Sequence, residues 1–175
     1  MHYMSLKKFN LLLLLTAFLT PAYSESLSPL KNDHVYSVYS GTFDTIDKEN
    51  DAKTSFYGIQ HSNTNLFKET ILGKFSPVTG GFLSGKNGIY LYTGVQAEYD
   101  LGPLSIVPSF TPGYYERGEG KELGSPLEFK SEIKIDLDIL KNSKIGFSYS
   151  HISNNDWGDI NPGINNKQIS FSKIF

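Results

Sequence analysis

The sequence predicts an all-β fold, an eight-stranded antiparallel transmembrane β-barrel that follows an N-terminal signal peptide. Two observations carry this prediction. From Asp33 onward, apolar and polar residues alternate with a period of two, and no run shows the 3.6-residue stripe of an amphipathic helix. Aromatic residues make up 14% of the 175 residues although the mean hydropathy is -0.27, so rings and polar groups must share the same short segments.

Residues 1–24 have the organisation of a secretory signal peptide. Lys7 and Lys8 precede an apolar stretch over 11–19, and the small residues Ala22 and Ser24 suit cleavage before Glu25. The apolar stretch is far shorter than the roughly 20 residues that a spanning helix needs. No later segment is long enough either, so a membrane location requires a β-barrel. We therefore expect residues 25–175 to form an outer-membrane β-barrel.

The alternating runs predict eight strands, at approximately 33–44, 53–62, 66–77, 88–100, 103–116, 126–140, 144–154 and 165–175. Clusters of Gly, Asn, Asp and Pro separate these runs. Their lengths match the roughly 9–11 residues of a tilted transmembrane strand. An even number of antiparallel strands with alternating faces is typical of outer-membrane barrels, and a barrel of eight strands is filled by its own side chains.

Five charged residues alternate with apolar residues in the strand predicted at 126–140: Lys130, Glu132, Lys134, Asp136 and Asp138. A basic residue that faces hydrocarbon at the middle of the membrane costs about 2–4 kcal/mol. We therefore expect the five charges to pair inside the barrel. A charged, filled interior fits a closed small barrel better than a pore.

The main alternative is a soluble periplasmic β-sandwich or lipocalin-like barrel. The same alternation would then place Ile, Phe and Tyr in the core and the charges in water. Periodicity alone leaves both architectures open. The chain ends on Phe175, as outer-membrane barrels characteristically do, and this favours the membrane barrel.

Composition excludes several classes of function. The chain has no Cys, which excludes disulfide scaffolds, Cys-ligated metals and thiol nucleophiles. A net charge of -2 and a pI near 6.1 argue against a nucleic-acid partner. The residues show no pattern that requires a cofactor or a metal, and we expect neither.

Five residues of the strand predicted at 144–154 share one face: Ile145, Phe147, Tyr149, His151 and Ser153. The Cα atoms of His151 and Ser153 lie about 6.6–6.8 Å apart in such a strand. An imidazole beside a hydroxyl can take its proton and activate the oxygen as a nucleophile. The loop that follows contains Asn154 and Asn161, and its amide groups could bind an oxyanion.

This region resembles the lipid A deacylase (PagL) family of outer-membrane barrels, also described as acyloxyacyl hydrolase-like. The motif is His151-Ile-Ser153-Asn154, followed by Asn161-Pro-Gly at the end of the loop. Residues 114–118 and 120–129 also resemble the family's fifth and sixth strands. The resemblance is good over about 104–175, whereas the first four strands match only in length and alternation.

The resemblance implies a serine esterase that removes an ester-linked (3-hydroxy)acyl chain from the lipid A of lipopolysaccharide. Ser153 matches the nucleophile, His151 the general base and Asn161 a residue of the oxyanion region, and Asn154 belongs to the same loop. We expect outer-membrane lipids to surround the barrel. A substrate in the outer leaflet can then diffuse laterally to a site on the outer face. Whether the protein forms a homodimer is left open, as is the acyl position that is cut.

Asn165 departs from the family pattern, which usually has Glu fourteen positions after the histidine. An amide oxygen can still accept the Nδ1–H bond and orient the imidazole, but it brings no negative charge. Asp156 or Asp159 is an alternative source of the carboxylate. The second functional hypothesis is therefore a non-catalytic barrel, structural or adhesive, in which the site has decayed.

Overall fold

A computed structural model of the chain describes residues 34–45, 53–64, 66, 69–70 and 73–175. The strands are β1 (His34–Phe43), β2 (Thr54–Asn63), β3 (Glu69–Thr70), β4 (Gly73–Ser84), β5 (Ile89–Leu101), β6 (Leu104–Glu116), β7 (Leu127–Leu140), β8 (Ser143–Ser153) and β9 (Ile164–Ile174). The predicted signal peptide lies outside the described residues. Within those residues, no helix is long and apolar enough to cross a membrane.

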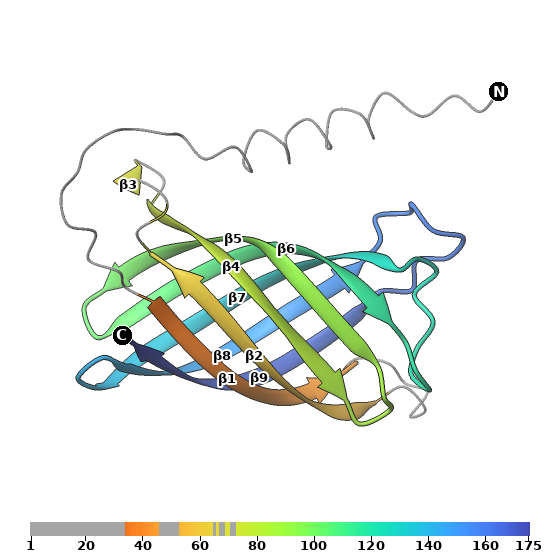
Figure 1. Ribbon diagram of the computed structural model, residues 1–175, viewed down its shortest axis with the longest axis horizontal. Helices are drawn as coiled ribbons and strands as arrows, with labels where there is room; N and C mark the ends of the chain where they lie inside the picture. The colour runs from red at the N-terminus through yellow and green to blue at the C-terminus, as the bar shows by residue number, and fades with distance from the viewer. Residues whose placement is uncertain (1–33, 46–52, 65, 67–68, 71–72) are drawn as a thin grey trace. The chain divides into compact units, whose positions relative to one another are not determined.

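The eight long strands close into an antiparallel barrel (Figure 1). Each pairs with its neighbour in the chain, and the circle closes because β1 pairs with both β2 and β9 while β2 pairs with β4. The short β3 adds two pairs at the end of β4. The predicted fold class is confirmed.

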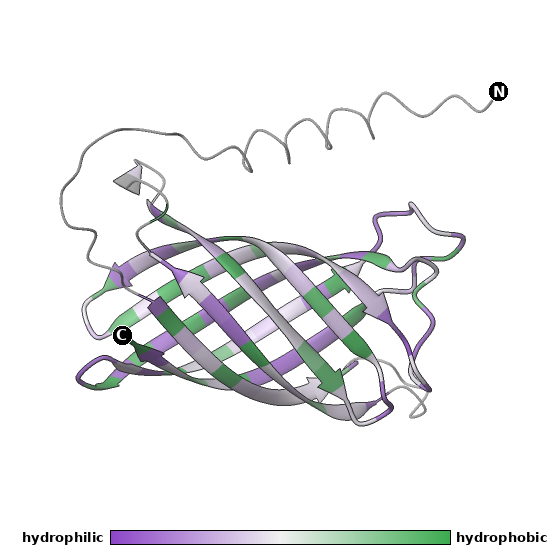
Figure 2. Ribbon diagram, in the orientation of Figure 1, coloured by the Kyte–Doolittle hydropathy of each residue, from purple (hydrophilic) through white to green (hydrophobic). Residues whose placement is uncertain are grey.

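Hydrophobic and hydrophilic residues alternate along the strands of the barrel (Figure 2). On β7, Ile133 and Ile135 point outward and are about half exposed, whereas the alternating Glu132 and Lys134 are buried inside. This is the inverse of a soluble barrel, whose apolar side chains fill the interior. The lipocalin-like alternative is therefore wrong, and the outward faces are suited to contact lipid.

The interior charges pair largely as predicted. Lys130 lies 3.1 Å from Glu132, and Lys134 lies 2.8 Å from Asp136, with all four side chains buried. Asp138 differs, because its side chain is 53% exposed and lies 3.8 Å from Lys144. It lies close to the turn between β7 and β8, where the barrel opens to solvent.

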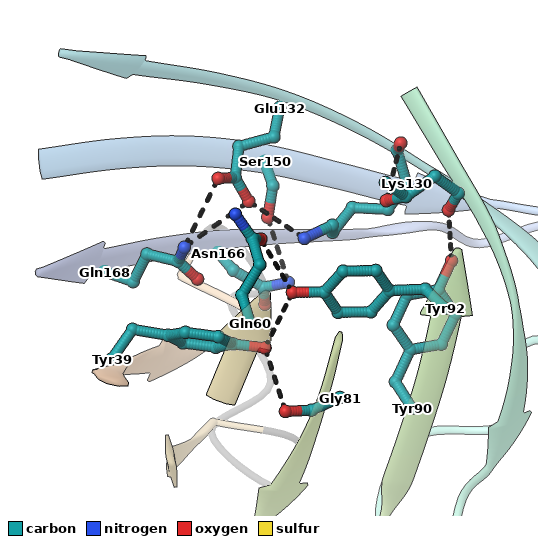
Figure 3. Close-up of polar contacts among 11 residues, drawn as sticks. Tyr39, Gln60, Gly81, Tyr90, Tyr92, Lys130, Glu132, Ser150, Asn166 and Gln168 are labelled. Atoms are coloured by element: carbon teal, nitrogen blue, oxygen red, sulfur yellow. Dashed lines mark hydrogen bonds and ion pairs between the residues drawn. The ribbon is translucent and has the colours of Figure 1, made fainter. Parts of the chain in front are cut away.

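Tyrosines and amides complete the polar network that fills the interior (Figure 3). The Tyr92 hydroxyl donates to Gln60 Oε1 at 2.9 Å, and the Lys130 ammonium lies 3.9 Å from the centre of the Tyr92 ring. The adjoining apolar cluster comprises Tyr39, Phe43, Phe56, Val78, Phe82, Tyr90, Tyr92, Tyr115, Leu123, Ile152 and Ile164. The interior is thus packed with side chains, as expected for an eight-stranded barrel.

The strand predicted at 66–77 is wrong in position, because β4 runs from Gly73 to Ser84. The Gly80-Gly81 pair suggests a turn, yet both glycines lie within the strand. A Cβ atom at Gly80 would lie 2.6 Å from the Tyr92 hydroxyl, so this glycine makes room for an interior ring. The other seven predicted strands agree with the structure to within one residue at each end.

The two ends of the barrel differ in their connections. At the end that carries Ser153, ten residues each separate β1 from β2, β6 from β7 and β8 from β9, and four separate β4 from β5. At the other end, two-residue turns join β5 to β6 and β7 to β8, and nine residues that include β3 separate β2 from β4. Outer-membrane barrels have short periplasmic turns and longer extracellular loops. The end of β8 that carries Ser153 thus has the three ten-residue connections, the arrangement expected of the extracellular end.

Candidate active site

His151 and Asn165 lie directly opposite each other on β8 and β9. Directly opposed residues of an antiparallel pair project to the same face, and here that face is the outside of the barrel. His151 Nδ1 lies 3.0 Å from Asn165 Oδ1. An amide oxygen can only accept, so Nδ1 carries the proton in this contact and Nε2 keeps a free lone pair.

Tyr149 adds a second donor to the same amide. Its hydroxyl donates to Asn165 Oδ1 at 2.8 Å. The period of two places Tyr149 beside His151 on the outer face, but sequence reasoning assigned it no part in the site. The signal that could have identified it is its parity with His151, combined with a polar partner on the next strand.

The Ser153 hydroxyl makes no hydrogen bond to any residue that the structure describes, and the ring of His151 bonds only to Asn165. Ser153 lies on the same face as His151, two positions further along β8 and half-buried. Hydrogen bonds between catalytic groups are often long or unformed without substrate and tighten when it binds. The structure thus joins the histidine to the amide and leaves the serine next to them.

Three aromatic side chains form an apolar wall beside Ser153. Phe129 lies opposite Ser153 on β7, and its ring meets the edge of Trp157 at 5.1 Å and stacks on Phe110 at 6.0 Å. Phe129 is only 9% exposed although its parity points outward, because the other two rings cover it. Sequence reasoning missed this wall, since it depends on how the loop folds back over β7.

Asn154 anchors the loop from inside the barrel. Its side chain is fully buried, and Nδ2 donates to the carbonyls of Leu123 at 2.6 Å and Ile160 at 2.8 Å. Its backbone N–H donates to Asn161 Oδ1 at 3.1 Å. The Asn154 side chain therefore points away from the face that carries Ser153, and its contacts hold the two ends of the loop together.

The alternative acids do not contact the imidazole. The Asp156 carboxylate accepts from Asn161 Nδ2 at 3.0 Å. Neither Asp156 nor Asp159 bonds to His151, so among the described side chains the amide at position 165 is the group that orients the ring. Within the same part of the chain, no three His, Asp or Glu side chains are grouped to hold a metal ion.

Gly163 brings the Asn-Pro-Gly turn against the imidazole. Its φ of +60° is a conformation that other residues adopt only with strain. A Cβ atom here would lie 2.8 Å from His151 Cε1 and 3.2 Å from His151 Nε2. Both the backbone and the close approach to the ring require glycine at this position.

The family model described as lipid A 3-O-deacylase (PagL) matches residues 41–173. The crystal structure of the outer membrane enzyme PagL is similar with a TM-score of 0.59 and 17% identity, covering 79% of this chain and 98% of that one. The Yersinia pestis outer membrane protein Ail, in a phospholipid bilayer nanodisc, gives a TM-score of 0.52 at 11% identity, over 83% and 100% of the chains.

A de novo designed transmembrane β-barrel gives a TM-score of 0.52 at 10% identity, covering 86% of this chain and all of that one. At such identities these structures show the fold alone. No curated protein sequence matches the chain, and the comparisons do not support a homodimer. Since the family model spans most of the sequence, the chain belongs to the lipid A 3-O-deacylase (PagL) family of bacterial outer-membrane β-barrels.

Proposed function

We propose that this protein is a serine esterase that removes an ester-linked (3-hydroxy)acyl chain from lipid A. The observation that carries the proposal is the contact between His151 Nδ1 and Asn165 Oδ1 on the outer face of the barrel. This contact leaves Nε2 free to act as a base for a hydroxyl on the same strand face. Ser153 is the hydroxyl at that position.

The reaction then follows the general course of serine hydrolases. Ser153 Oγ bonds to the ester carbonyl carbon while His151 Nε2 takes the hydroxyl proton. The bond to the sugar oxygen breaks, that oxygen receives the proton, and the acyl group stays on Ser153. A water molecule, deprotonated by His151, releases the fatty acid and restores the serine. Backbone N–H groups of the loop that follows Ser153 are the donors for the oxyanion, because Asn154 Nδ2 and Asn161 Nδ2 already donate to other groups.

The surroundings of Ser153 suit a lipid substrate. Acyl chains of lipid A lie in the outer leaflet, in contact with the outer face of the barrel. The rings of Phe110, Phe129 and Trp157 present an apolar surface beside the hydroxyl. An acyl chain can align along this surface, and its ester can reach Ser153 without entering the packed interior.

Mass spectrometry of lipid A from cells that express the protein tests this proposal. Expression should remove the mass of one ester-linked acyl chain, and Ser153→Ala should restore the full mass. Both proteins must be folded in the outer membrane, which the shift of a folded barrel in unheated gel electrophoresis verifies. Unchanged lipid A in cells that contain the folded wild-type barrel contradicts an esterase.

A non-catalytic barrel is the second candidate, and Asn165 is the observation that favours it. An amide cannot stabilise an imidazolium with a full negative charge. Asn165→Glu discriminates between the two functions. A large gain in deacylation identifies a weakened enzyme, whereas no activity in either form favours a structural or adhesive role.

A further inference from the structure

An amide at position 165 raises a problem of orientation that a carboxylate does not. Both oxygens of a carboxylate accept hydrogen bonds, so either can face the ring of a histidine. An asparagine side chain has one acceptor and one donor. With Oδ1 toward His151, Nδ1 carries the proton and Nε2 is a base. With Nδ2 toward His151, the amide instead favours a proton on Nε2, and the ring cannot take a proton from Ser153.

The structure contains a second group that distinguishes the two orientations. The Tyr149 hydroxyl donates to Asn165 Oδ1 at 2.8 Å, the same atom that contacts His151 Nδ1 at 3.0 Å. We infer that Tyr149 is a positioning residue that holds the amide oxygen of Asn165 toward His151. This inference rests on the proposed esterase function, in which His151 must be unprotonated at Nε2.

Among the described residues, the Tyr149 hydroxyl bonds to Asn165 and to no other group. Lys167 lies opposite Tyr149 on β9, and an ammonium group only donates. Phe147 precedes it on the outer face and is apolar. If the amide turned over, the phenol would face an NH2 group, its proton would be left without an acceptor, and the phenolic oxygen would serve as a weak acceptor.

The backbone of Asn165 is fixed independently of its side chain. Its carbonyl accepts from Thr45 twice, from the backbone N–H at 2.7 Å and from the hydroxyl at 3.1 Å. Only the side-chain torsions therefore remain to be set, and His151 and Tyr149 set them together. One neutral hydrogen bond of ordinary net strength biases the amide orientation by about 2- to 12-fold.

A double-mutant cycle tests this role. Tyr149→Phe should lower kcat for lipid A about 2- to 12-fold and leave KM unchanged. In the Asn165→Asp background the same change should cause no loss of kcat, because either carboxylate oxygen can accept from His151. Tyr57→Phe is the matched control, since Tyr57 also faces outward and its hydroxyl bonds to no described residue. An equal loss in both backgrounds, or none in either, overturns the inference.

The tautomer can also be measured without turnover. The chain contains four histidines, so ¹⁵N-histidine labelling of the Ser153→Ala barrel gives few imidazole signals. His151 should be protonated at Nδ1, and Tyr149→Phe should shift it toward the Nε2-protonated form. An Nε2-protonated His151 in the parent, or no change on Tyr149→Phe, overturns the inference. If the expected tautomers occur but lipid A is never cleaved, the esterase function fails and the role of Tyr149 stands.

Discussion

Replacing Gly163 by alanine should damage the site more than the fold. The φ of +60° costs a residue with a Cβ atom about 1–2 kcal/mol. The new methyl group would lie 2.8 Å from His151 Cε1, well inside ordinary carbon–carbon contact, so the imidazole must move by several tenths of an ångström. A misplacement of about 1 Å can cost 10²-fold in rate. We therefore expect at least a roughly tenfold fall in kcat.

Gly102→Ala is the matched control, because Gly102 has a φ of +74° and a Cβ atom there meets nothing within 4 Å. Both variants should lose a similar free energy of unfolding in urea titrations of the barrel in lipid vesicles. Only Gly163→Ala should lose deacylation of lipid A, measured under conditions where both barrels are folded. Equal activity of the two variants would show that the glycine does not set the position of the imidazole.

Three further changes give distinct expectations. Lys130→Met should destabilise the barrel by about 3–5 kcal/mol in urea unfolding, because it leaves the buried Glu132 carboxylate without its cation, and adding Glu132→Leu should recover most of that loss. Asn154→Ala should cost about 1–3 kcal/mol and speed proteolysis of the loop, because the buried carbonyl of Leu123 and the carbonyl of Ile160 lose their donor; unchanged protection from protease would contradict the anchoring role of Asn154. Trp157→Ala should raise KM for long-chain esters more than for short-chain esters, since it removes part of the apolar wall, and a uniform effect on both would argue against chain binding there.

Seven of the eight strands could be predicted from the sequence to within one residue. Each has an inner and an outer face with opposite requirements, so the alternation fixes both the strand and its orientation. The third strand failed because Gly80 and Gly81 resemble a turn. The role of Gly80 depends on the interior ring of Tyr92 from the next strand, and a local pattern does not contain that contact.

The face of the barrel on which each site residue lies could also be predicted from the sequence. Parity put His151, Ser153 and Asn165 on one face, and the same rule would have placed the side chain of Asn154 inside the barrel. Parity also places Tyr149 on this face, but its bond to Asn165 and the wall of Phe129 and Trp157 were not predictable. They depend on strand register and on the path of a ten-residue loop, neither of which a single sequence specifies.

The outward position of Ser153 has a consequence for any kinetic measurement. A site on the lipid-facing wall meets substrate only within the plane of the bilayer or micelle. The rate of deacylation should therefore follow the mole fraction of lipid A in that plane. It should fall when inert detergent is added while the bulk concentration of lipid A is held constant. Such surface dilution would distinguish it from a hydrolase whose pocket opens to water.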